Sequence, residues 1–514
     1  MLSDELTQLI RDDEMSLLTE FYRDKLDGVL SCYDRIVITG TLPQLCYAQG
    51  MTGYLYQHGI RIFDYARFAE PFREQLRHNA ERIAKENNIK IEHIRKKKTK
   101  KEKIVQKVLR RRGTAPGLVH IISAMESCDS YQPWHDKQSG KTYLKPRSGQ
   151  CLHYYFYFID EELGLCYVRV PTWCPFRLQI YFNGHHWLAS KLTEQGVKFS
   201  MLDNAFEFIE DYQKAQNIVD AFSVEELHKK LDHFAQQYCP VHTHFNQVYH
   251  WSVMQAEFAT DIIFKQQADL QEIYDHLFRT AIHTVKPDNL ATFLGGKQLT
   301  NYQGEVGNRY NVRIEGARIK HTMGEVAIKM YDKFKKILRI ETTVNNLTFF
   351  RHYRTVEHRD GTTSKKYAAM KKNIYSLVPL QKLLLASNRR YLEFISAFDD
   401  HSSGHQNLRR VSQAVEKSNR KYRGFNFFEN EDLKLLLAIA RGEFNISGFK
   451  NRDLRKFLPT KTPAQISRLI KRLRMHGLIR KAKNAYKYYL TKLGKKVIAT
   501  ALKIKELIIV PKLA

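Results

Sequence analysis

The stretch TPAQISRLIKRLRMHGLIRK, residues 462–481, predicts a helix with a defined start and two contrasting faces. Thr462 and Gln465 stand at the spacing of a capping box, and Pro463 takes the first helical position, where its missing N–H costs nothing. Apolar residues then recur at helical spacing and predict one buried stripe: Ile466, Leu469, Ile470 and Leu473. The rest of the helix surface collects cations: Arg468, Lys471, Arg472 and Arg474.

The residues around this helix predict a winged helix-turn-helix over residues 421–514. Two amphipathic helices precede it, in EDLKLLLAIARG and NRDLRKFL, and two short strands flank Lys483-Asn484 after it. Thr491 is placed to cap a closing helix. In such a fold the third helix enters the major groove and the hairpin touches the DNA backbone.

The charge of the predicted third helix favours DNA as its partner. A helix that only packs against a core needs no cations on its outer face, whereas a helix that follows phosphates does. The alternative is a winged helix that binds protein and is only incidentally basic. The residues expected to contact nucleic acid here are Arg468, Lys471, Arg472, Arg474, Lys481, Lys483, Asn484 and Lys487.

The whole chain is strongly basic. Its 514 residues predict roughly three to four domains. The 83 Lys and Arg residues outnumber the 54 Asp and Glu residues and give a formal net charge of +29. Because such an excess favours a polyanionic partner, we expect the chain to bind DNA, with structured RNA as the alternative polymer.

The sequence predicts a cytoplasmic protein without a membrane partner. No apolar run approaches the roughly 18 residues of a spanning helix. The acidic start MLSDELTQLIRDDE lacks the pattern of a secretory signal. The seven cysteines are scattered and never form C-x-x-C, which favours a reducing compartment and disfavours a cysteine-built zinc site.

Residues 1–205 predict a mixed α/β region. Strand and helix patterns alternate up to about residue 125, which favours a largely parallel sheet covered on both faces. The stretch CLHYYFYFIDEELGLCYVRVPT, residues 151–172, predicts a hairpin whose consecutive aromatic residues occupy both faces of a buried strand.

A basic arm, residues 95–112, interrupts this region with eleven cations and one acid, Glu102. Like charges in this number repel one another unless phosphates neutralise them. The alternative interpretation is a solvated helix with a lysine-rich leader. The arm residues expected to contact nucleic acid are Lys97, Lys98, Lys100 and Lys101.

Residues 206–300 predict a helical region that includes the run from Val253 to Thr284. His242 and His244 have the spacing of the His-hydrophobe-His strand of rolling-circle nickases. Because Thr243 stands where that strand has a hydrophobe, the pattern is a weak indication of a metal site.

Residues 301–420 predict an antiparallel β meander with flanking helices. Gly324 and the pair Lys335-Lys336 divide residues 316–346 into three short strands. Because side chains alternate along a strand, the apolar residues fall on one side: Ile319, Ile328, Met330, Leu338 and Ile340. The other side collects Arg318, Lys320, Lys329, Tyr331, Lys333, Arg339, Glu341 and Thr343.

This second side supports two interpretations. A salt-bridged solvent face has a similar composition, but the cations outnumber Glu341 and leave positive charge for a phosphodiester. Asp332 lies on the opposite face by the same alternation, so it shares a metal with Glu341 only if a bulge intervenes. The residues expected to contact nucleic acid are Arg318, Lys320, Lys329 and Arg339.

Several segments resemble a family of bacterial proteins of similar length that are labelled MarR-type winged-helix regulators. They are YDRIVITGTLP (33–43), CLHYYFYFIDEELGLCYVRVPTW (151–173), GARIKHTMGEVAIKMYDK (316–333), LRIETTVNN (338–346) and NRRYLEFISAF (388–398). More locally, IKMYDK followed by LRIE is similar to two core strands of filamentous-phage-type and plasmid replication initiators, which nick DNA through a tyrosine. That similarity implies core-strand positions for Tyr331, Asp332, Lys333, Arg339 and Glu341.

Two functions follow for this α+β chain. The first is metal-dependent nicking or cleavage of nucleic acid, in a mobile element or in replication, with carboxylates that converge on Mg²⁺ or Mn²⁺. Asp34, Asp160 and Glu341 are the candidate catalytic and metal-binding residues, and Tyr331 is a candidate nucleophile. The second is a non-catalytic MarR-like transcriptional regulator whose large remainder senses a ligand or dimerises. The apolar residues 502–510 favour a homodimer.

Overall fold

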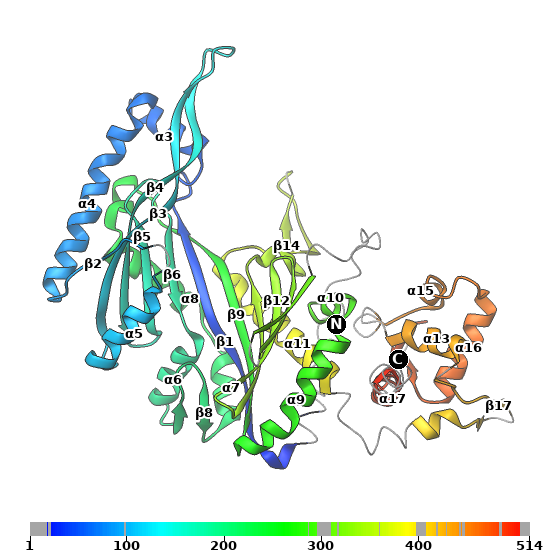
Figure 1. The fold of residues 1–514 in the computed structure, drawn as a ribbon. Coiled ribbons are helices and arrows are strands. Elements are labelled where there is room, and N and C mark those ends of the chain that lie inside the picture. The colour runs from blue at the N-terminus through cyan, green and yellow to red at the C-terminus, as the bar shows by residue number, and fades with distance from the viewer. Residues whose placement is uncertain are drawn as a thin grey trace. The chain divides into compact units, whose positions relative to one another are not determined.

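The computed structural model describes residues 18, 22–96, 99–285, 287–295, 310–315, 318–358, 360–396, 408–417, 420–427, 429–440, 444, 448–482 and 486–503. The fold belongs to the α+β class, as predicted, with one large mixed sheet and several small antiparallel hairpins (Figure 1). The chain divides into two compact units. Unit 1 comprises Met1–Val29, Thr260–Thr342 and Leu383–Ala514, and unit 2 comprises Leu30–Ala259 and Thr343–Lys382.

The large sheet has eleven strands in the order β10-β11-β12-β13-β9-β1-β6-β5-β4-β3-β2. The division into units falls inside β1, β9 and β13, so each of these strands contributes residues to both units. The bounds are β1 (Leu26–Thr41), β2 (Glu92–Ile94), β3 (Gly117–His135), β4 (Thr142–Asp160), β5 (Gly164–Pro171), β6 (Leu178–Phe182), β9 (His250–Phe264), β10 (Tyr310–Glu315), β11 (Arg318–Met323), β12 (Val326–Lys333) and β13 (Ile337–Val344).

Helices and short hairpins complete unit 2. Its α-helices are α3 (Ala48–Gln57), α4 (Tyr65–Glu86), α5 (Lys101–Arg112), α6 (Gly184–Glu194), α7 (Tyr212–Asp220) and α8 (Val224–Tyr238). Its 3₁₀ turns are η2 (Ile62–Asp64), η3 (Pro240–Phe245), η4 (Leu347–Phe349) and η5 (Ile374–Ser376). Its two hairpins are β7 (Phe199–Met201) with β8 (Phe206–Ile209) and β14 (Arg351–Glu357) with β15 (Thr363–Ala369).

The prediction of a largely parallel amino-terminal sheet was wrong. Only the short β2 runs parallel to β3, whereas β3, β4, β5, β6 and β1 pair antiparallel in that order. Short turns at residues 136–141 and 161–163 connect β3 to β4 and β4 to β5, and such turns can join only antiparallel neighbours. The predicted hairpin over residues 151–172 is confirmed as β4 and β5.

The aromatic run of β4 is buried on both faces of the sheet, as predicted. Phe156 and Phe158 stack on Tyr238 of α8, with ring centroids 4.7 and 5.3 Å apart. The alternate residues Tyr155 and Tyr157 pack in a cluster with Val105 of α5. Helices α8 and α5 therefore cover opposite faces of this part of the sheet.

The middle of the chain contains a long strand where a helix was expected. Strand β9 occupies His250–Phe264, so helix covers only the later part of the Val253–Thr284 run, as α9 (Gln267–Thr284). The end of β9 is buried at consecutive residues, including Ile262, Ile263 and Phe264. A strand covered on both faces shows no alternation, so periodicity alone does not separate it from a buried helix.

The β meander of unit 1 is confirmed. Strands β11 and β12 pair antiparallel, with Arg318 opposite Tyr331 and Lys320 opposite Lys329, and β13 follows β12 in the sheet. Positive φ angles at Gly324 and in the turn at residues 334–335 mark the two corners. The remaining elements of this part of unit 1 are η1 (Arg23–Lys25), α9, α10 (Pro287–Phe293) and most of α11 (Leu377–Ser396).

The C-terminal elements begin with a short hairpin that was not predicted, and the helices and strands after this hairpin follow one another in the predicted order. They are β16 (Val415–Lys417), β17 (Arg420–Tyr422), α13 (Asn430–Ala440), α15 (Asn451–Arg455), α16 (Pro463–Met475), β18 (Ile479–Lys481), β19 (Tyr488–Leu490) and α17 (Lys492–Lys503). The capping box is present, because Gln465 N–H donates to Thr462 Oγ1 and Thr462 N–H donates to Gln465 Oε1. The predicted dimerisation stretch, residues 502–510, lies almost wholly outside the described residues.

Glu126 of β3 joins three elements of unit 2. It accepts hydrogen bonds from Lys101 Nζ of α5 at 2.7 Å, from the Tyr155 phenol of β4 at 2.7 Å and from Arg169 Nη2 of β5 at 3.1 Å. Burial alone raises the pKa of Glu126, but these donors outweigh it and lower the pKa to about 2.

We expect Glu126→Gln to destabilise the protein in a pH-dependent way. The folded pKa lies below the unfolded value of about 4.3, so the stabilisation is complete above that value and is lost as the pH falls towards 2. Urea unfolding should show a gap in the free energy of unfolding at pH 7 that narrows between about pH 4 and pH 2. The exposed Glu81→Gln is the control, and a gap that is independent of pH would contradict this assignment.

Candidate nucleic-acid interface and carboxylate sites

Three cations of α16 face solvent together. Arg468, Lys471 and Arg474 are exposed and spaced three residues apart, so they follow one side of the helix. The opposite stripe is buried at Ile466, Ile470 and Leu473, with Leu469 packed against the same core. Burial of the stripe therefore holds these cations on the outer face, as the sequence predicted.

Arg472 does not belong to this outer face. Its Nη1 and Nη2 lie 2.7 and 2.8 Å from the two carboxylate oxygens of Asp432 on α13. It also donates to the carbonyl oxygens of Arg423 and Gly424, and its guanidinium lies 3.9 Å from the ring centroid of Phe425. The predicted nucleic-acid contact of Arg472 is thus replaced by an internal one that ties α16 to α13.

The hairpin after α16 carries further cations, and two of those that the structure describes were predicted to contact nucleic acid. Lys481 is exposed, with its ammonium 4.4 Å from the ring centroid of Tyr486, and Tyr486 is itself 80% exposed. Lys487 lies 5.9 Å from the ring centroid of Tyr489. Lys483 and Asn484, predicted at the hairpin tip, lie outside the described residues.

The later part of the basic arm, Lys101–Arg112, forms helix α5, and Val105 packs this helix against the sheet. Lys101 forms an ion pair with Glu126, whereas Lys100 is exposed. Lys97 and Lys98 lie outside the part of the chain that the structure describes. A hollow of about 270 Å³ adjoins the arm and is lined by Arg95, Lys96, Thr99, Lys101, Glu126 and residues of β3 and β4.

Glu341 lies at the centre of a polar cluster in unit 1. It is 2% exposed and accepts hydrogen bonds from Lys329 Nζ at 2.5 Å and from the Tyr331 phenol at 2.7 Å. The predicted common face of these three residues is therefore confirmed. Both interpretations of this side, a salt-bridged solvent face and a face that binds a phosphodiester, need it to be exposed, which is wrong for β13 because every residue of that strand is buried.

Arg339 is the clearest case of this burial. It is 0% exposed, and its Nε and Nη2 each lie 2.6 Å from an oxygen of Asp261 on β9. Arg339 was predicted to contact nucleic acid but is enclosed in the core, whereas Arg318 on β11 is exposed and Lys320 is partly exposed.

The predicted histidine pair lies on the 3₁₀ turn η3 rather than on a strand. His242 is hydrogen-bonded to the Cys239 carbonyl, and His244 is hydrogen-bonded to Gln75.

Asp34 of β1 lies beside a second carboxylate, Glu257 of β9, with ligand oxygens within 4.8 Å of one another. Asp34 is 6% exposed and accepts hydrogen bonds from Asn204 Nδ2 at 2.7 Å and Asn183 Nδ2 at 3.3 Å. His185 Nδ1 lies 3.1 Å from the same Asp34 oxygen. Closely spaced oxygens of this kind suit Mg²⁺ or Mn²⁺.

A close approach of backbone to backbone positions these Asp34 partners. Asn183 caps α6 by accepting the N–H of His185 at 2.8 Å. A Cβ at Gly184 would lie 2.1 Å from the Tyr33 carbonyl oxygen, so glycine is needed where α6 begins beside β1. Glu257 was missed at the sequence level because it fell in the stretch that was interpreted as helix.

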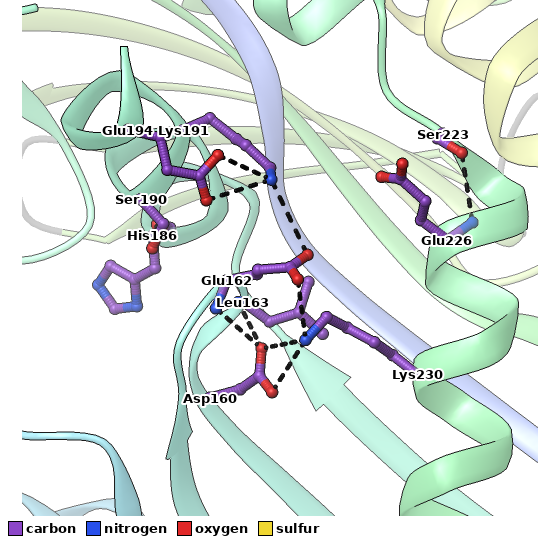
Figure 2. Close-up of polar contacts among 10 residues, drawn as sticks. All are labelled: Asp160, Glu162, Leu163, His186, Ser190, Lys191, Glu194, Ser223, Glu226 and Lys230. Carbon is purple, nitrogen blue, oxygen red and sulfur yellow. Dashed lines mark hydrogen bonds and ion pairs between the residues drawn. The ribbon is translucent and has the colours of Figure 1, made fainter. Parts of the chain in front are cut away.

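Asp160 serves a different purpose from Asp34. Figure 2 shows its carboxylate at the β4–β5 turn, where it accepts the N–H groups of Glu162 at 3.0 Å and Leu163 at 2.9 Å. Lys230 of α8 lies 3.0 Å from the same carboxylate and 3.4 Å from Glu162. These contacts hold the turn against α8, and Asp160 is not part of the Asp34–Glu257 pair.

Comparison of the chain with protein-family models, with curated proteins and with solved structures gave no match. The resemblances to MarR-type regulators and to replication initiators therefore stay predictions. Within the ranges that the structure describes, no helix combines the length and the apolarity needed to cross a membrane.

We expect Arg472→Ala to destabilise the protein strongly. It would leave the buried Asp432 without its partner, and removal of one member of a buried ion pair costs about 3–5 kcal/mol. The exposed Arg468→Ala should change the free energy of unfolding by no more than about 0.5 kcal/mol. Chemical denaturation compares the two variants, and equal small effects would contradict the structural role of Arg472.

Proposed function

We propose that this chain binds duplex DNA through α16 and the β18–β19 hairpin, in the manner of a winged helix. The observation that carries the proposal is the cationic face of α16: Arg468, Lys471 and Arg474 point away from a buried apolar stripe. In helix-turn-helix proteins a helix with this arrangement lies in the major groove, and cations at its edges meet phosphates.

The pairing of α15 with α16 supports this role. Asn451 at the start of α15 donates from Nδ2 to the Pro463 carbonyl at 3.0 Å and to Ser467 Oγ at 2.8 Å. These bonds hold the first turn of α16 against the preceding helix. A helix that inserts into a groove needs such support, because its orientation sets which base pairs it can reach.

Duplex DNA fits this helix better than duplex RNA does. The major groove of B-form DNA admits an α-helix, whereas the deep and narrow groove of A-form RNA does not. The formal charge of +29 supplies a long-range attraction to either polymer, so the fit of the groove, rather than charge, favours DNA.

We expect the triple variant Arg468→Ala/Lys471→Ala/Arg474→Ala to weaken DNA binding. Each lost phosphate contact should make the negative slope of log K against log salt concentration shallower by about 1. Fluorescence anisotropy of a labelled duplex over a salt series measures this slope. Lys471→Ala and Lys434→Ala, an exposed lysine of α13, form a matched single pair, and an equal loss in both would contradict a contact specific to α16.

Metal-dependent cleavage of DNA is a second candidate function, supported by the proximity of Asp34 and Glu257. A divalent ion held by such carboxylates polarises a phosphodiester and lowers the pKa of bound water. Asn183 and Asn204 would keep Asp34 oriented through their hydrogen bonds. In unit 1, the hydrogen bond from the Tyr331 phenol to Glu341 provides the nucleophile-and-base contact that the alternative tyrosine route needs.

We expect cleavage of supercoiled or single-stranded DNA with Mg²⁺ or Mn²⁺ and none with a chelator. Asp34→Asn and Glu257→Gln should abolish it while DNA is still retarded on a gel, and the exposed Glu225→Gln should retain it. Tyr331→Phe separates the tyrosine route from the metal route, because only the tyrosine route needs the phenol. DNA that is bound but uncut under all conditions would rule out cleavage and favour a non-catalytic regulator.

A further inference from the structure

Strands β14 and β15 of unit 2 form a two-stranded ribbon that is solvated on both faces. Its register runs from Arg351 opposite Ala369 to Glu357 opposite Thr363. None of the residues of either strand is buried. Because isolated two-stranded hairpins are only marginally stable in water, an ordered ribbon of this kind needs support from its root or from a partner.

The root of the ribbon is firmly held. Phe350 and Met370 flank the two strands, are 3% and 1% exposed, and are joined by the Met370 N–H bond to the Phe350 carbonyl at 2.9 Å. Beyond Met370, the Lys372 carbonyl accepts the N–H of Val253 on β9 at 2.7 Å. The ribbon is thus exposed to solvent but fixed at its base, so its side chains are held in position to contact a partner.

The two faces of the ribbon carry aromatic rings and cations. Tyr353 and Tyr367 lie opposite one another, with ring centroids 5.7 Å apart, and are 77% and 46% exposed. On the other face Arg354 lies directly opposite Lys366. Like charges in opposite positions destabilise a sheet pair, so the Arg354–Lys366 pair is unfavourable unless an anion lies close to it.

The cations of the ribbon are not neutralised from within. Arg354 Nε donates to the Ala369 carbonyl at 2.8 Å, and Arg351 lies over the Tyr367 ring. Neither arginine, nor Lys365 or Lys366, forms an ion pair with any residue in the described ranges. At the tip, the Asp360 carboxylate accepts hydrogen bonds from the N–H and the hydroxyl of Thr362, which are contacts within the turn.

We propose that the β14–β15 ribbon enters a groove of duplex DNA as a second contact, separate from α16. This inference rests on the proposed function, because both assign duplex DNA as the ligand. The major groove, about 12 Å wide, admits a two-stranded β-ribbon. In this arrangement the two faces of the ribbon meet phosphates on the two sides of the groove, through Arg354 and Lys366 on one face and through Arg351 and Lys365 on the other. The groove of A-form RNA is too deep and narrow for this contact.

The test uses the full chain and a labelled DNA duplex. In the double variant Arg354→Ala/Lys366→Ala, the negative slope of log K against log salt concentration should become shallower by about 2, one for each phosphate contact. The control Lys229→Ala/Lys382→Ala removes the same charge from two exposed helical lysines of unit 2 and should keep the wild-type slope. Arg354→Lys retains the charge and should also keep it. Thermal unfolding verifies that all variants are folded.

The outcomes separate this inference from the proposed function. A double variant with wild-type slope, beside a weakened α16 variant, would overturn the ribbon contact and leave DNA binding by α16 intact. A wild-type chain that does not bind the duplex would overturn both. A double variant that loses affinity for single-stranded DNA or for duplex RNA, but not for duplex DNA, would also overturn the ribbon contact.

Discussion

The burial of the apolar stripe of α16 is the constraint on which the C-terminal part of the structure depends. Ile466, Ile470 and Leu473 must leave water, and a helix can bury only one side in this way. The orientation of the helix then follows, and with it the direction of each cation. Arg468 and Lys471 face solvent, whereas Arg472 lies close enough to the buried side for Asp432 to bind it.

A similar competition for charge operates in the rest of the molecule. Buried or partly buried carboxylates pair with nearby cations, as the buried Asp261 does with Arg339, the buried Glu341 with Lys329 and the partly buried Glu126 with Lys101. Such pairs consume positive charge inside the fold, where desolvation would otherwise make single charges costly. The cations outside such pairs include those on the outer face of α16 and on the β14–β15 ribbon. These surfaces carry the proposals for DNA binding, because there the excess charge is exposed.

Local features were predictable from the sequence. The Thr462 cap, the apolar stripe of α16 and the meander with its shared face of Lys329, Tyr331 and Glu341 all follow from spacing within a few residues. Partners distant in the chain were not predictable in this way. Asp432 lies 40 residues from Arg472 and Asp261 lies 78 residues from Arg339. Local spacing predicted that both arginines lie on outer faces. It could not show that each would form an ion pair with a carboxylate that is distant in the sequence.

The pairing of strands in the large sheet was also beyond what local sequence patterns could predict. The end of β9 is covered on both faces and has no alternation to distinguish it from a helix, so the run from Val253 was interpreted as helical and Glu257 was not recognised as a neighbour of Asp34. Antiparallel order among β3, β4 and β5 was partly visible in the short turn at Asp160, but the helices on either side of this region suggested a parallel arrangement. Strand direction depends on pairing that only the folded chain determines.

The most direct test of this account is the affinity of the wild-type chain for duplex DNA over a series of salt concentrations. The account predicts that log K falls linearly with log salt concentration, with a slope that reports several phosphate contacts. The absence of binding at low salt, or binding that is independent of salt, would contradict the claim that the exposed cations of this chain meet a DNA backbone.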